Sequence, residues 1–340
     1  MIVDAHCHII APAMLTPAVP LQWRPVLRSE AGRQVITFRG RTLHSVVAEF
    51  CDVDAMLAEA AADGVDHLVL SPWIMLVPVE AGLDEAIRVC RVQNEALAGV
   101  AASGRVSALG AVPLQDGPVA ARELATLMKL PGLCGAEIPA SVAGDYLGED
   151  RFLPFWEAAA DTGALIFVHP TTTGFRLPAL APYYLWNSAG NPLETAITAA
   201  QLATAGIMER YPRLKILLAH GGGGLHALRG RLRRAFAVRP EARARSAEGP
   251  DAALHRFYYD TITHDQALLA DLVEYAGADH VLLGSDRPFD MGAEHPAAAV
   301  TNLGLAAGEQ LILGGNARRL LSIPDGADPP SCGMLSPDPR

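Results

Sequence analysis

Two histidines separated by one residue stand near the beginning of the chain, in Asp4-Ala5-His6-Cys7-His8. They end an apolar run of strand length, in which alternate side chains point to the same face. His6 and His8 are then roughly 6–7 Å apart, at two rises of about 3.3 Å. Two imidazoles in this arrangement can converge on one ion. Taken alone, the pair also fits a polar strand end that carries two unrelated histidines.

Three further polar residues end later apolar runs: His169 after Ile166-Phe167-Val168, His220 after Leu217-Leu218-Ala219, and Asp286 after Leu283-Gly284-Ser285. Singly, each has an ordinary interpretation, such as a hydrogen-bonded core histidine, a helix-capping donor, or an N-cap or partner of the next arginine. Together with the first pair they make five polar groups beside apolar strands. Burying five such groups costs several kcal/mol unless something pairs them.

A divalent cation would pair these groups. Three imidazoles and one carboxylate, with space for water, match a catalytic Zn²⁺ site, and Mn²⁺ or Fe²⁺ fits the same ligand types. The fifth group, His220, would then be free to act as an acid or base. The candidate fourth strand ends Ala136-Glu137-Ile138-Pro139 without a lysine, and neither Lys129 nor Lys215 ends a strand. A two-metal site bridged by a carbamylated lysine is therefore not expected, and the site should be mononuclear.

The elements that must position these residues alternate in type along the chain. Short apolar runs of strand length are separated by longer Ala-, Leu-, Glu- and Arg-rich stretches of helical period. The strand candidates are 2–6, 67–71, 106–112, 133–138, 164–169, 215–220, 257–261 and 281–285. The helix candidates are 53–63, 83–103, 119–129, 151–162, 192–210, 225–239, 266–277 and 311–321. This order predicts a (β/α)8 TIM barrel, a single domain over residues 1–323 in which the strand ends meet at one mouth.

An open doubly wound sheet is the alternative fold, disfavoured because no G-x-G-x-x-G follows the first strand. Two regions interrupt the alternation. Residues 11–48, with a β-like piece at 34–38, form an insertion after strand 1, and residues 171–191 form a loop after strand 5. Both should lie over the C-terminal face of the barrel, the first as a small lid. The Pro-rich segment 324–340 should be a loose tail.

Composition narrows the class of protein. The 340 residues carry a formal net charge of −10, which argues against partners such as nucleic acid or an anionic membrane. No apolar stretch is long enough to span a membrane, and no signal peptide is expected. The five cysteines are odd in number and form no C-x-x-C pair, which favours a reducing compartment and so a cytoplasmic location.

These residues resemble the amidohydrolase superfamily (amidohydrolase family 2), and within it the branch around aminocarboxymuconate semialdehyde decarboxylase. The similarity spans roughly residues 1–323. It is carried by Asp4-Ala5-His6-Cys7-His8, Phe167-Val168-His169-Pro170, Asn191-Pro192-Leu193-Glu194-Thr195, Leu218-Ala219-His220-Gly221-Gly222-Gly223, Phe257-Tyr258-Tyr259-Asp260 and Leu283-Gly284-Ser285-Asp286-Arg287-Pro288-Phe289. The resemblance implies one divalent metal per chain, with His6, His8, His169 and Asp286 as ligands. It also implies His220 as general base.

The family also uses arginines to hold a substrate carboxylate. By resemblance Arg231 is the arginine that a neighbouring subunit contributes, which implies a homodimer or a higher homo-oligomer. Arg41 is the candidate from the chain's own insertion, with Arg39 as its competitor. Trp186 and Phe289 are further candidates to contact substrate. Where the decarboxylase of the muconate carries Tyr this chain has Arg287, which argues against that same substrate; Arg287 and Arg176 are anion contacts or ion-pair partners.

Three functions remain open at this point. The first is non-oxidative decarboxylation, a carbon–carbon lyase reaction, of a small unsaturated or aromatic carboxylic acid by metal-activated water, with His220 and Asp286 as catalytic residues. The second is hydrolysis of a lactone, ester or amide, or hydration of a double bond, on the same site. The third is a barrel that binds metal or ligand without catalysis; because no expected ligand or base is missing, it is disfavoured.

Overall fold

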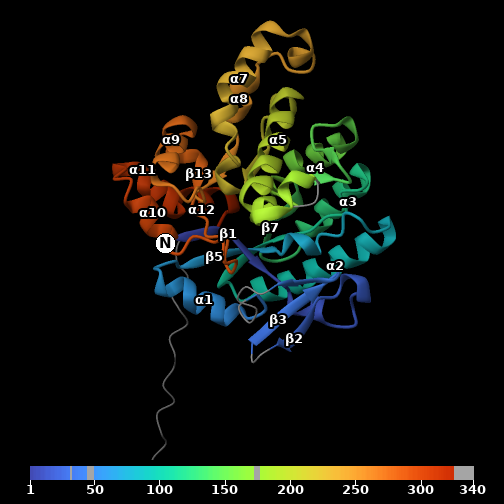
Figure 1. Cartoon of the computed structure of the whole chain (residues 1–340). Helices are drawn as coiled ribbons and strands as arrows, with labels where there is room; N and C mark the ends of the chain where they lie inside the picture. The colour runs from blue at the N-terminus through green and yellow to red at the C-terminus, as the bar shows by residue number, and fades with distance from the viewer. Residues whose placement is uncertain (31–32, 44–49, 172–176, 325–340) are drawn as a thin grey trace, which may run out of the picture.

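Eight parallel strands form the centre of the molecule in the computed structural model, which describes residues 1–30, 33–43, 50–171 and 177–324. The strands are neighbours in chain order, as in a TIM barrel (Figure 1). They are β1 (Val3–Ile9), β5 (His67–Pro72), β6 (Val106–Gly110), β7 (Leu133–Pro139), β10 (Leu165–His169), β11 (Lys215–Leu218), β12 (Tyr258–Asp260) and β13 (Val281–Leu282). All eight predicted strands are confirmed, with shifted bounds; β1, for example, continues past both of its histidines.

Backbone hydrogen bonds between β1 and the segment after β13 close the barrel. The Ala5 N–H donates to the Leu283 carbonyl (2.8 Å), and the Asp286 N–H donates to the His6 carbonyl (2.8 Å). The buried carboxylate of Asp4 accepts hydrogen bonds from the backbone N–H groups of His6 and Ser285, both at 3.1 Å. This seam fixes the register of the first and last strands, and so places Asp286 beside His6.

Helices surround the strands. They are α1 (Val53–Ala62), α2 (Leu83–Ala101), α3 (Gly117–Leu127), α4 (Leu153–Thr162), α5 (Asn191–Thr204), α6 (Ile207–Arg210), α7 (Leu225–Val238), α8 (Pro250–Leu254), α9 (Gln266–Ala276), α10 (Pro296–Thr301), α11 (Ala306–Gln310) and α12 (Asn316–Leu321). Side chains of Asp52, Asp116 and Asp265 cap the N-termini of α1, α3 and α9, satisfying backbone N–H groups that have no intrahelical partner.

Two predicted helices differ from expectation. The segment expected to be one helix over 192–210 is divided into α5 and α6 at Gly206, which has a φ of +70°. A Cβ atom there would lie 2.5 Å from the Arg245 carbonyl, so a chain segment distant in sequence determines the break. The last predicted helix, 311–321, begins with a π-helical turn over Leu311–Gly315 before α12.

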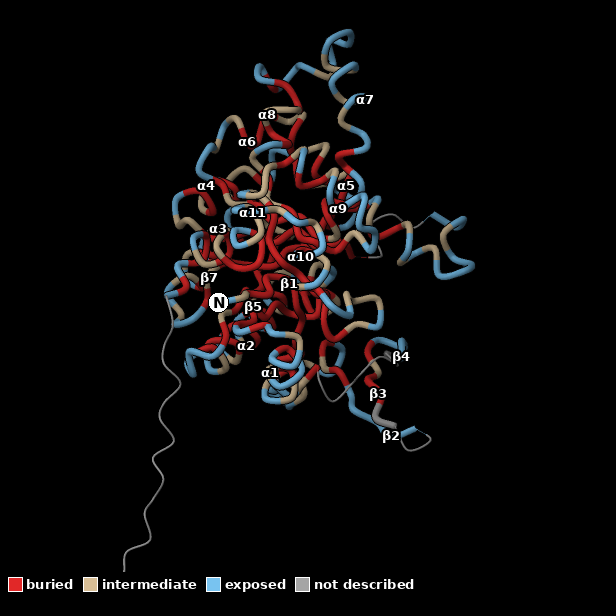
Figure 2. The backbone as a smooth tube through the Cα atoms, turned by 90° about the vertical axis from the view of Figure 1, so that its left-hand side faces the viewer, coloured by how far each residue is buried: buried red, intermediate tan, exposed pale blue. Residues whose placement is uncertain are grey.

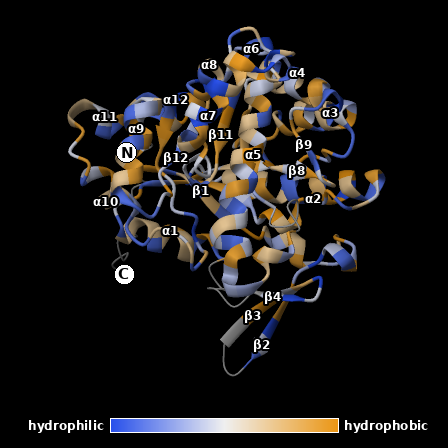
Figure 3. Ribbon diagram, turned by 45° about the horizontal axis from the view of Figure 1, so that its top comes forward, coloured by the Kyte–Doolittle hydropathy of each residue, from blue (hydrophilic) through white to orange (hydrophobic). Residues whose placement is uncertain are grey.

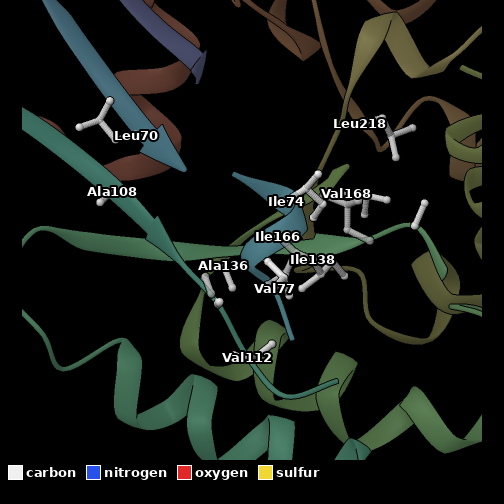
Figure 4. Packing of buried hydrophobic residues seen from close by; sticks show 14 of the residues in the cluster. Leu70, Ile74, Val77, Ala108, Val112, Ala136, Ile138, Ile166, Val168 and Leu218 are labelled. Atoms are coloured by element: carbon white, nitrogen blue, oxygen red, sulfur yellow. The ribbon is translucent and has the colours of Figure 1, made fainter. Parts of the chain in front are cut away.

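Apolar side chains fill the space between strands and helices. Ala136, Ile138, Ile166 and Val168 of neighbouring strands pack together in Figure 4 and are all fully buried. Buried backbone is concentrated at the centre of the molecule in Figure 2, and hydrophobic colours gather on β11 and β12 in Figure 3. The polar residues of the barrel mouth are therefore held by a continuous apolar core.

The insertion after β1 contains a small antiparallel sheet of β2 (Val26–Glu30), β3 (Arg33–Phe38) and β4 (Arg41–Leu43). The predicted β-like piece corresponds to β3, whereas β2 and β4 were not predicted. Phe38 anchors the sheet, with its ring 5.7 Å from that of Trp73, which follows β5. Residues 31–32 and 44–48 of the predicted insertion, residues 172–176 of the predicted loop, and all of the predicted tail except Pro324 lie outside the described residues.

Helix α7 and the segment that follows it extend away from the barrel (Figures 1 and 2). Of its fourteen residues only Leu225 and His226 are buried. The exposed part carries Arg231, Arg233 and Arg234. Among the described helices there is none that is long and apolar enough to cross a membrane.

Candidate metal centre

The structure brings together the five polar residues that the sequence placed at strand ends. His6 and His8 belong to β1, and His169 is the last residue of β10. His220 follows β11 and Asp286 follows β13. All are buried except His220, whose side chain is 15% exposed. Because parallel strands present their carboxyl ends to one face, residues 280 positions apart share one small volume.

The Nε2 atoms of three rings face this volume. The Nδ1 hydrogens are used elsewhere: His6 donates to Asp260 (2.6 Å), and His8 and His169 donate to the carbonyls of Pro72 (3.2 Å) and Pro170 (2.9 Å). In the neutral form of each ring, a hydrogen on Nδ1 leaves the lone pair on Nε2. The Nε2 atom of His169 is buried and has no hydrogen-bond partner in the described part of the chain.

Distances between the inward-facing atoms match those of a coordination sphere. The Nε2 atoms of His6 and His8 are 3.0 Å apart, and each lies near Asp286 Oδ1, at 3.3 and 3.1 Å. Ligand atoms around a tetrahedral Zn²⁺, at bond lengths of about 2.0–2.1 Å, are roughly 3.3 Å apart. Lone pairs and a carboxylate oxygen repel each other at such distances unless a positive charge lies between them. The donor set therefore fits a divalent cation.

The pKa shifts of these residues also indicate that positive charge is favoured at the centre of the cluster. Burial alone would lower the pKa of His6, but the neighbouring carboxylates of Asp286 and Asp260 raise it to about 10. Burial lowers the pKa of both His8 and His169. Burial opposes ionisation of Asp286, but the charge of His6 and hydrogen bonds from the rings lower its pKa well below the usual range. In the metal-free protein, a raised pKa at His6 thus favours a proton where a cation would supply positive charge.

Asp260, at the end of β12, supports both sides of the site. Its Oδ2 accepts hydrogen bonds from His6 Nδ1 and from the His220 backbone N–H (2.8 Å), and its Oδ1 accepts one from the Gly221 N–H (2.7 Å). It orients one ring and anchors the turn after β11. The sequence placed Asp260 in a family motif without a role, although a carboxylate that ends the seventh strand was a usable signal.

Glu137 on β7 is a second residue whose importance the sequence did not reveal. Its side chain is fully buried, 3.8 Å from His8 Nδ1 and 3.9 Å from His169 Nδ1. Neither carboxyl oxygen has a hydrogen-bond partner among the described residues. Burial raises the pKa of Glu137 well above its usual range. An acidic residue within an otherwise apolar strand was the available signal.

His220 is suited to proton transfer by its position. Its Nε2 lies 3.5 Å from Asp286 Oδ2, at the edge of the cluster, and its Nδ1 has no hydrogen-bond partner among the residues described. Both His220 (φ +58°) and Asp286 (φ +60°) have left-handed backbone conformations, which are uncommon for residues with side chains. Such strain is found where surrounding structure holds a side chain in a required place, often at functional sites.

A cavity of about 440 Å³ opens over the strand ends. Its lining residues include Ile74, Pro139 and Thr171, which follow or end β5, β7 and β10, and both candidate arginines of the insertion, but none of the five polar residues described above. Arg39 stacks on Trp23 and pairs with Glu80 at 2.9 Å. Arg41 lines the same cavity and makes no ion pair with any described residue.

The remaining candidates differ in their relation to the site. Phe289 is half-buried, with its ring 5.2 Å from the ring of His8. Trp186 is 36% exposed and packs against Tyr184 in the loop after β10. Arg231 is exposed on α7 and contacts none of the metal-centre residues of its own chain. Arg287 points away, into ion pairs with Asp63 and Glu59, so its role as an ion-pair partner is confirmed. Arg176 lies outside the described residues.

Comparisons with known proteins identify the family of this chain. The family model described as amidohydrolase matches residues 3–323. The chain belongs to the amidohydrolase family. Among curated relatives, 2-amino-3-carboxymuconate-6-semialdehyde decarboxylase of Dictyostelium discoideum is 27% identical, over 94% of this chain and 91% of the relative. Gamma-resorcylate decarboxylase of a Rhizobium species is 28% identical, over 81% and 88%.

Solved structures show the same fold. 5-carboxyvanillate decarboxylase of Sphingomonas paucimobilis has a TM-score of 0.81 with 23% identity, covering 95% of this chain and 99% of its own. A dihydroxybenzoic acid decarboxylase of a Polaromonas species, solved with bound manganese, has a TM-score of 0.75 with 24% identity, covering 95% and 97%. The expected barrel and the expected family branch are both confirmed.

Proposed function

We propose that this protein is a metal-dependent non-oxidative decarboxylase, a carbon–carbon lyase, that acts on a small unsaturated or aromatic carboxylic acid. The observation that carries the proposal is the convergence of three Nε2 lone pairs and one carboxylate at the mouth of an amidohydrolase barrel, next to an uncoordinated His220. The relatives at 27–28% identity that span most of the chain are named as decarboxylases.

His6, His8, His169 and Asp286 would hold the cation, for which Zn²⁺ is our first choice because imidazole nitrogens dominate the donor set. Mn²⁺, which is bound in one structural neighbour, and Fe²⁺ fit the same ligand types. When bound, such a cation polarises substrate oxygens and lowers the pKa of water. The ligands need no rearrangement, since their orienting hydrogen bonds to Asp260, Pro72 and Pro170 already exist.

His220 moves the proton in this proposal. In the overall reaction the bond between the carboxylate carbon and the rest of the substrate breaks, its electron pair stays on the substrate, and a proton takes the place of carbon dioxide. His220 can carry that proton because one ring nitrogen faces Asp286 and the other has no partner among the described residues. Asp286, by accepting from His220, keeps the ring pointed at the site.

Substrate binding falls to residues around the cavity. Arg41 would bind an anionic substituent of the substrate, because it lines the cavity and forms no ion pair with the residues that the structure describes. Phe289 and Trp186 would provide aromatic walls, and the β2–β4 sheet would act as a lid. Arg231 would enter the site of a neighbouring subunit, making the working form a homodimer or a higher homo-oligomer. Its place on an extended, exposed helix supports this assignment.

We place the protein in the cytoplasm and treat residues 1–323 as one functional unit. The four cysteines in the described part of the chain, Cys7, Cys51, Cys90 and Cys134, are all unpaired, as expected in a reducing compartment. Cys7 is buried and donates to the Val69 carbonyl, so it belongs to the core rather than to the chemistry.

The test measures carbon dioxide release and acid release in parallel. The metal-loaded protein is incubated with a panel of aromatic carboxylic acids and with lactones, esters and amides. We expect carbon dioxide from at least one carboxylic acid, with one ion bound per chain, and retention of the ion but loss of turnover in His220→Ala. His295→Ala, which removes an exposed histidine, is the matched control. Acid release from a lactone, ester or amide without carbon dioxide release would contradict the proposal.

A further inference from the structure

The cavity of about 440 Å³ is lined by two chemically different groups of residues. Among the described lining residues, the charged ones are Arg39 and Arg41 of the insertion and Glu80, which precedes α2. The barrel and the segment after β5 contribute apolar side chains instead. These form what we call the apolar wall: Ile74, Met75, Val77, Val79 and Pro139. The proposed reaction gives this wall no role.

The backbone behind the wall offers few free hydrogen-bonding groups. The Val77 N–H donates to the Ile74 carbonyl (3.0 Å), and the Val79 N–H donates to the Val77 carbonyl (2.9 Å). The Pro78 carbonyl accepts a hydrogen bond from the Gln115 side chain (2.5 Å). A ligand hydroxyl placed against this segment would therefore lose water without gaining a hydrogen bond, whereas an apolar group would lose nothing.

The apolar wall adjoins the metal centre through neighbouring backbone. Pro139 is the register partner of His169 on the adjacent strand. Ile74 follows by two residues Pro72, whose carbonyl accepts the hydrogen bond from His8. A substrate whose carboxylate reaches the cation site can thus extend a substituent along the wall. The cavity volume lies within the range of about 300–1,000 Å³ that encloses drug-sized ligands, so a second ring fits.

We infer that the apolar wall is a subsite for an apolar substituent, and that the preferred substrate is an aromatic carboxylic acid with an alkyl or aryl group rather than hydroxyl groups alone. Met75 and Val79 are the specificity-determining residues. They are half-buried, so a ligand can cover their side chains, whereas Ile74 and Val77 are already buried. This inference rests on the proposed function, because it names the substrate class of that site.

The first test measures binding to the metal-loaded protein by isothermal titration calorimetry. The probes are benzoic acid, 3,5-dihydroxybenzoic acid and the 2-, 3- and 4-isomers of biphenylcarboxylic acid, which direct a second ring to different sides. We expect at least one biphenyl isomer to bind about 10–100-fold more tightly than benzoic acid, because its second ring leaves water. We expect no such gain for 3,5-dihydroxybenzoic acid.

The second test uses the double variant Met75→Gln/Val79→Thr, which places polar groups in the wall with little change in size. It should reduce the gain of the biphenyl isomer at least fivefold and leave the affinity for benzoic acid within twofold of the wild type. Met128→Gln/Val92→Thr is the matched control. It makes the same exchanges at half-buried positions at the end of α3 and on α2, and should leave all affinities unchanged.

Four outcomes decide the inference. Equal affinity for benzoic acid and all three biphenyl isomers would overturn it, as would a gain that survives in Met75→Gln/Val79→Thr or a larger gain with 3,5-dihydroxybenzoic acid. Carbon dioxide release from the same acids separates it from the proposed function. Release without any biphenyl gain would overturn the apolar subsite alone. A wall-dependent gain without carbon dioxide from any acid would support the subsite and contradict decarboxylation.

Discussion

The barrel mouth and helix α7 are built on opposite principles. At the mouth, His6, His8, His169 and Asp286 are buried, and hydrogen bonds to Asp260 and to the carbonyls of Pro72 and Pro170 orient the three rings. On α7, Arg231 is exposed and makes no ion pair with any residue that the structure describes. In the proposed function, the metal ligands and the proton-transfer residue all come from one chain, whereas one substrate-binding arginine comes from a second chain.

This difference separates two kinds of residue. Groups that touch the cation must be preorganised, because a misplaced ligand weakens the site. Groups that select substrates can lie on exposed elements, as loops and insertions of barrels commonly do. Changes at the mouth should abolish the reaction, and changes on α7 or the insertion should alter substrate use while the cation stays bound.

The largest effect is expected at His220. Asparagine tolerates the left-handed backbone of this position better than alanine, so His220→Asn isolates the loss of the imidazole. We expect kcat to fall about 10³-fold, within the range for removal of a general acid or base. Metal content, measured by atomic emission, should stay at the wild-type level. A kcat within tenfold of the wild type would remove His220 from the proposed role.

The next effect tests the contribution of a second chain. Arg231→Ala should lower kcat/KM about 10²-fold, because a charge-assisted contact to substrate is lost. Mixing it with His220→Asn, after subunit exchange, should restore about a quarter of wild-type activity, since half of the dimers are mixed and each has one intact site. Arg234→Ala on the same helix is the control. No recovery on mixing would place Arg231 outside the neighbouring site.

A smaller effect distinguishes the two arginines of the insertion. Arg41→Ala should raise KM about 10–100-fold, the equivalent of a lost charged hydrogen bond of about 1.5–3 kcal/mol. Arg39→Ala should raise KM less, because its guanidinium is already paired with Glu80. Steady-state kinetics on one accepted substrate give both values. A larger KM change in Arg39→Ala would exchange the two assignments.

The smallest effect concerns pH. In the metal-free protein the pKa of His6 is raised to about 10, whereas burial lowers those of His8 and His169. A cation must therefore displace one proton, so its apparent affinity should fall about tenfold for each unit that pH decreases from 9 to 7. Competition titrations at several pH values measure the slope. A slope near zero, or near three, would show that the charge state of the rings has been misjudged.

The sequence predicts the barrel and the five mouth residues because both follow from local rules. Strand alternation pairs His6 with His8, and the parallel order brings the ends of β10 and β13 to the same face. These rules need only the pattern along the chain. The position of Phe38 in the small sheet depends instead on its contact with Trp73, and the helix break at Gly206 depends on the nearby carbonyl of Arg245. Trp73 and Arg245 are distant in sequence, so local patterns did not predict either feature.

Glu137 shows a subtler limit. The sequence places Glu137 at the end of the fourth strand. There it served only to show that this strand carries no lysine to bridge two metal ions. Glu137 stands out because its oxygens lack hydrogen bonds to described residues and lie at nearly equal distances from the rings of His8 and His169. Both features depend on the three-dimensional structure and cannot be seen in the sequence. Asp260 was similarly recognisable as a strand-end acid, but its bond to His6 required the strand register.

The central claim is that one cation is held by three Nε2 atoms and one carboxylate of a single chain. Anomalous diffraction at the metal absorption edge tests it directly on crystals of the metal-loaded protein. The account predicts one peak per chain, at bonding distance of about 2.0–2.2 Å from His6, His8, His169 and Asp286. A peak that any of these four side chains fails to reach, or a peak beside Glu137 instead, would contradict it.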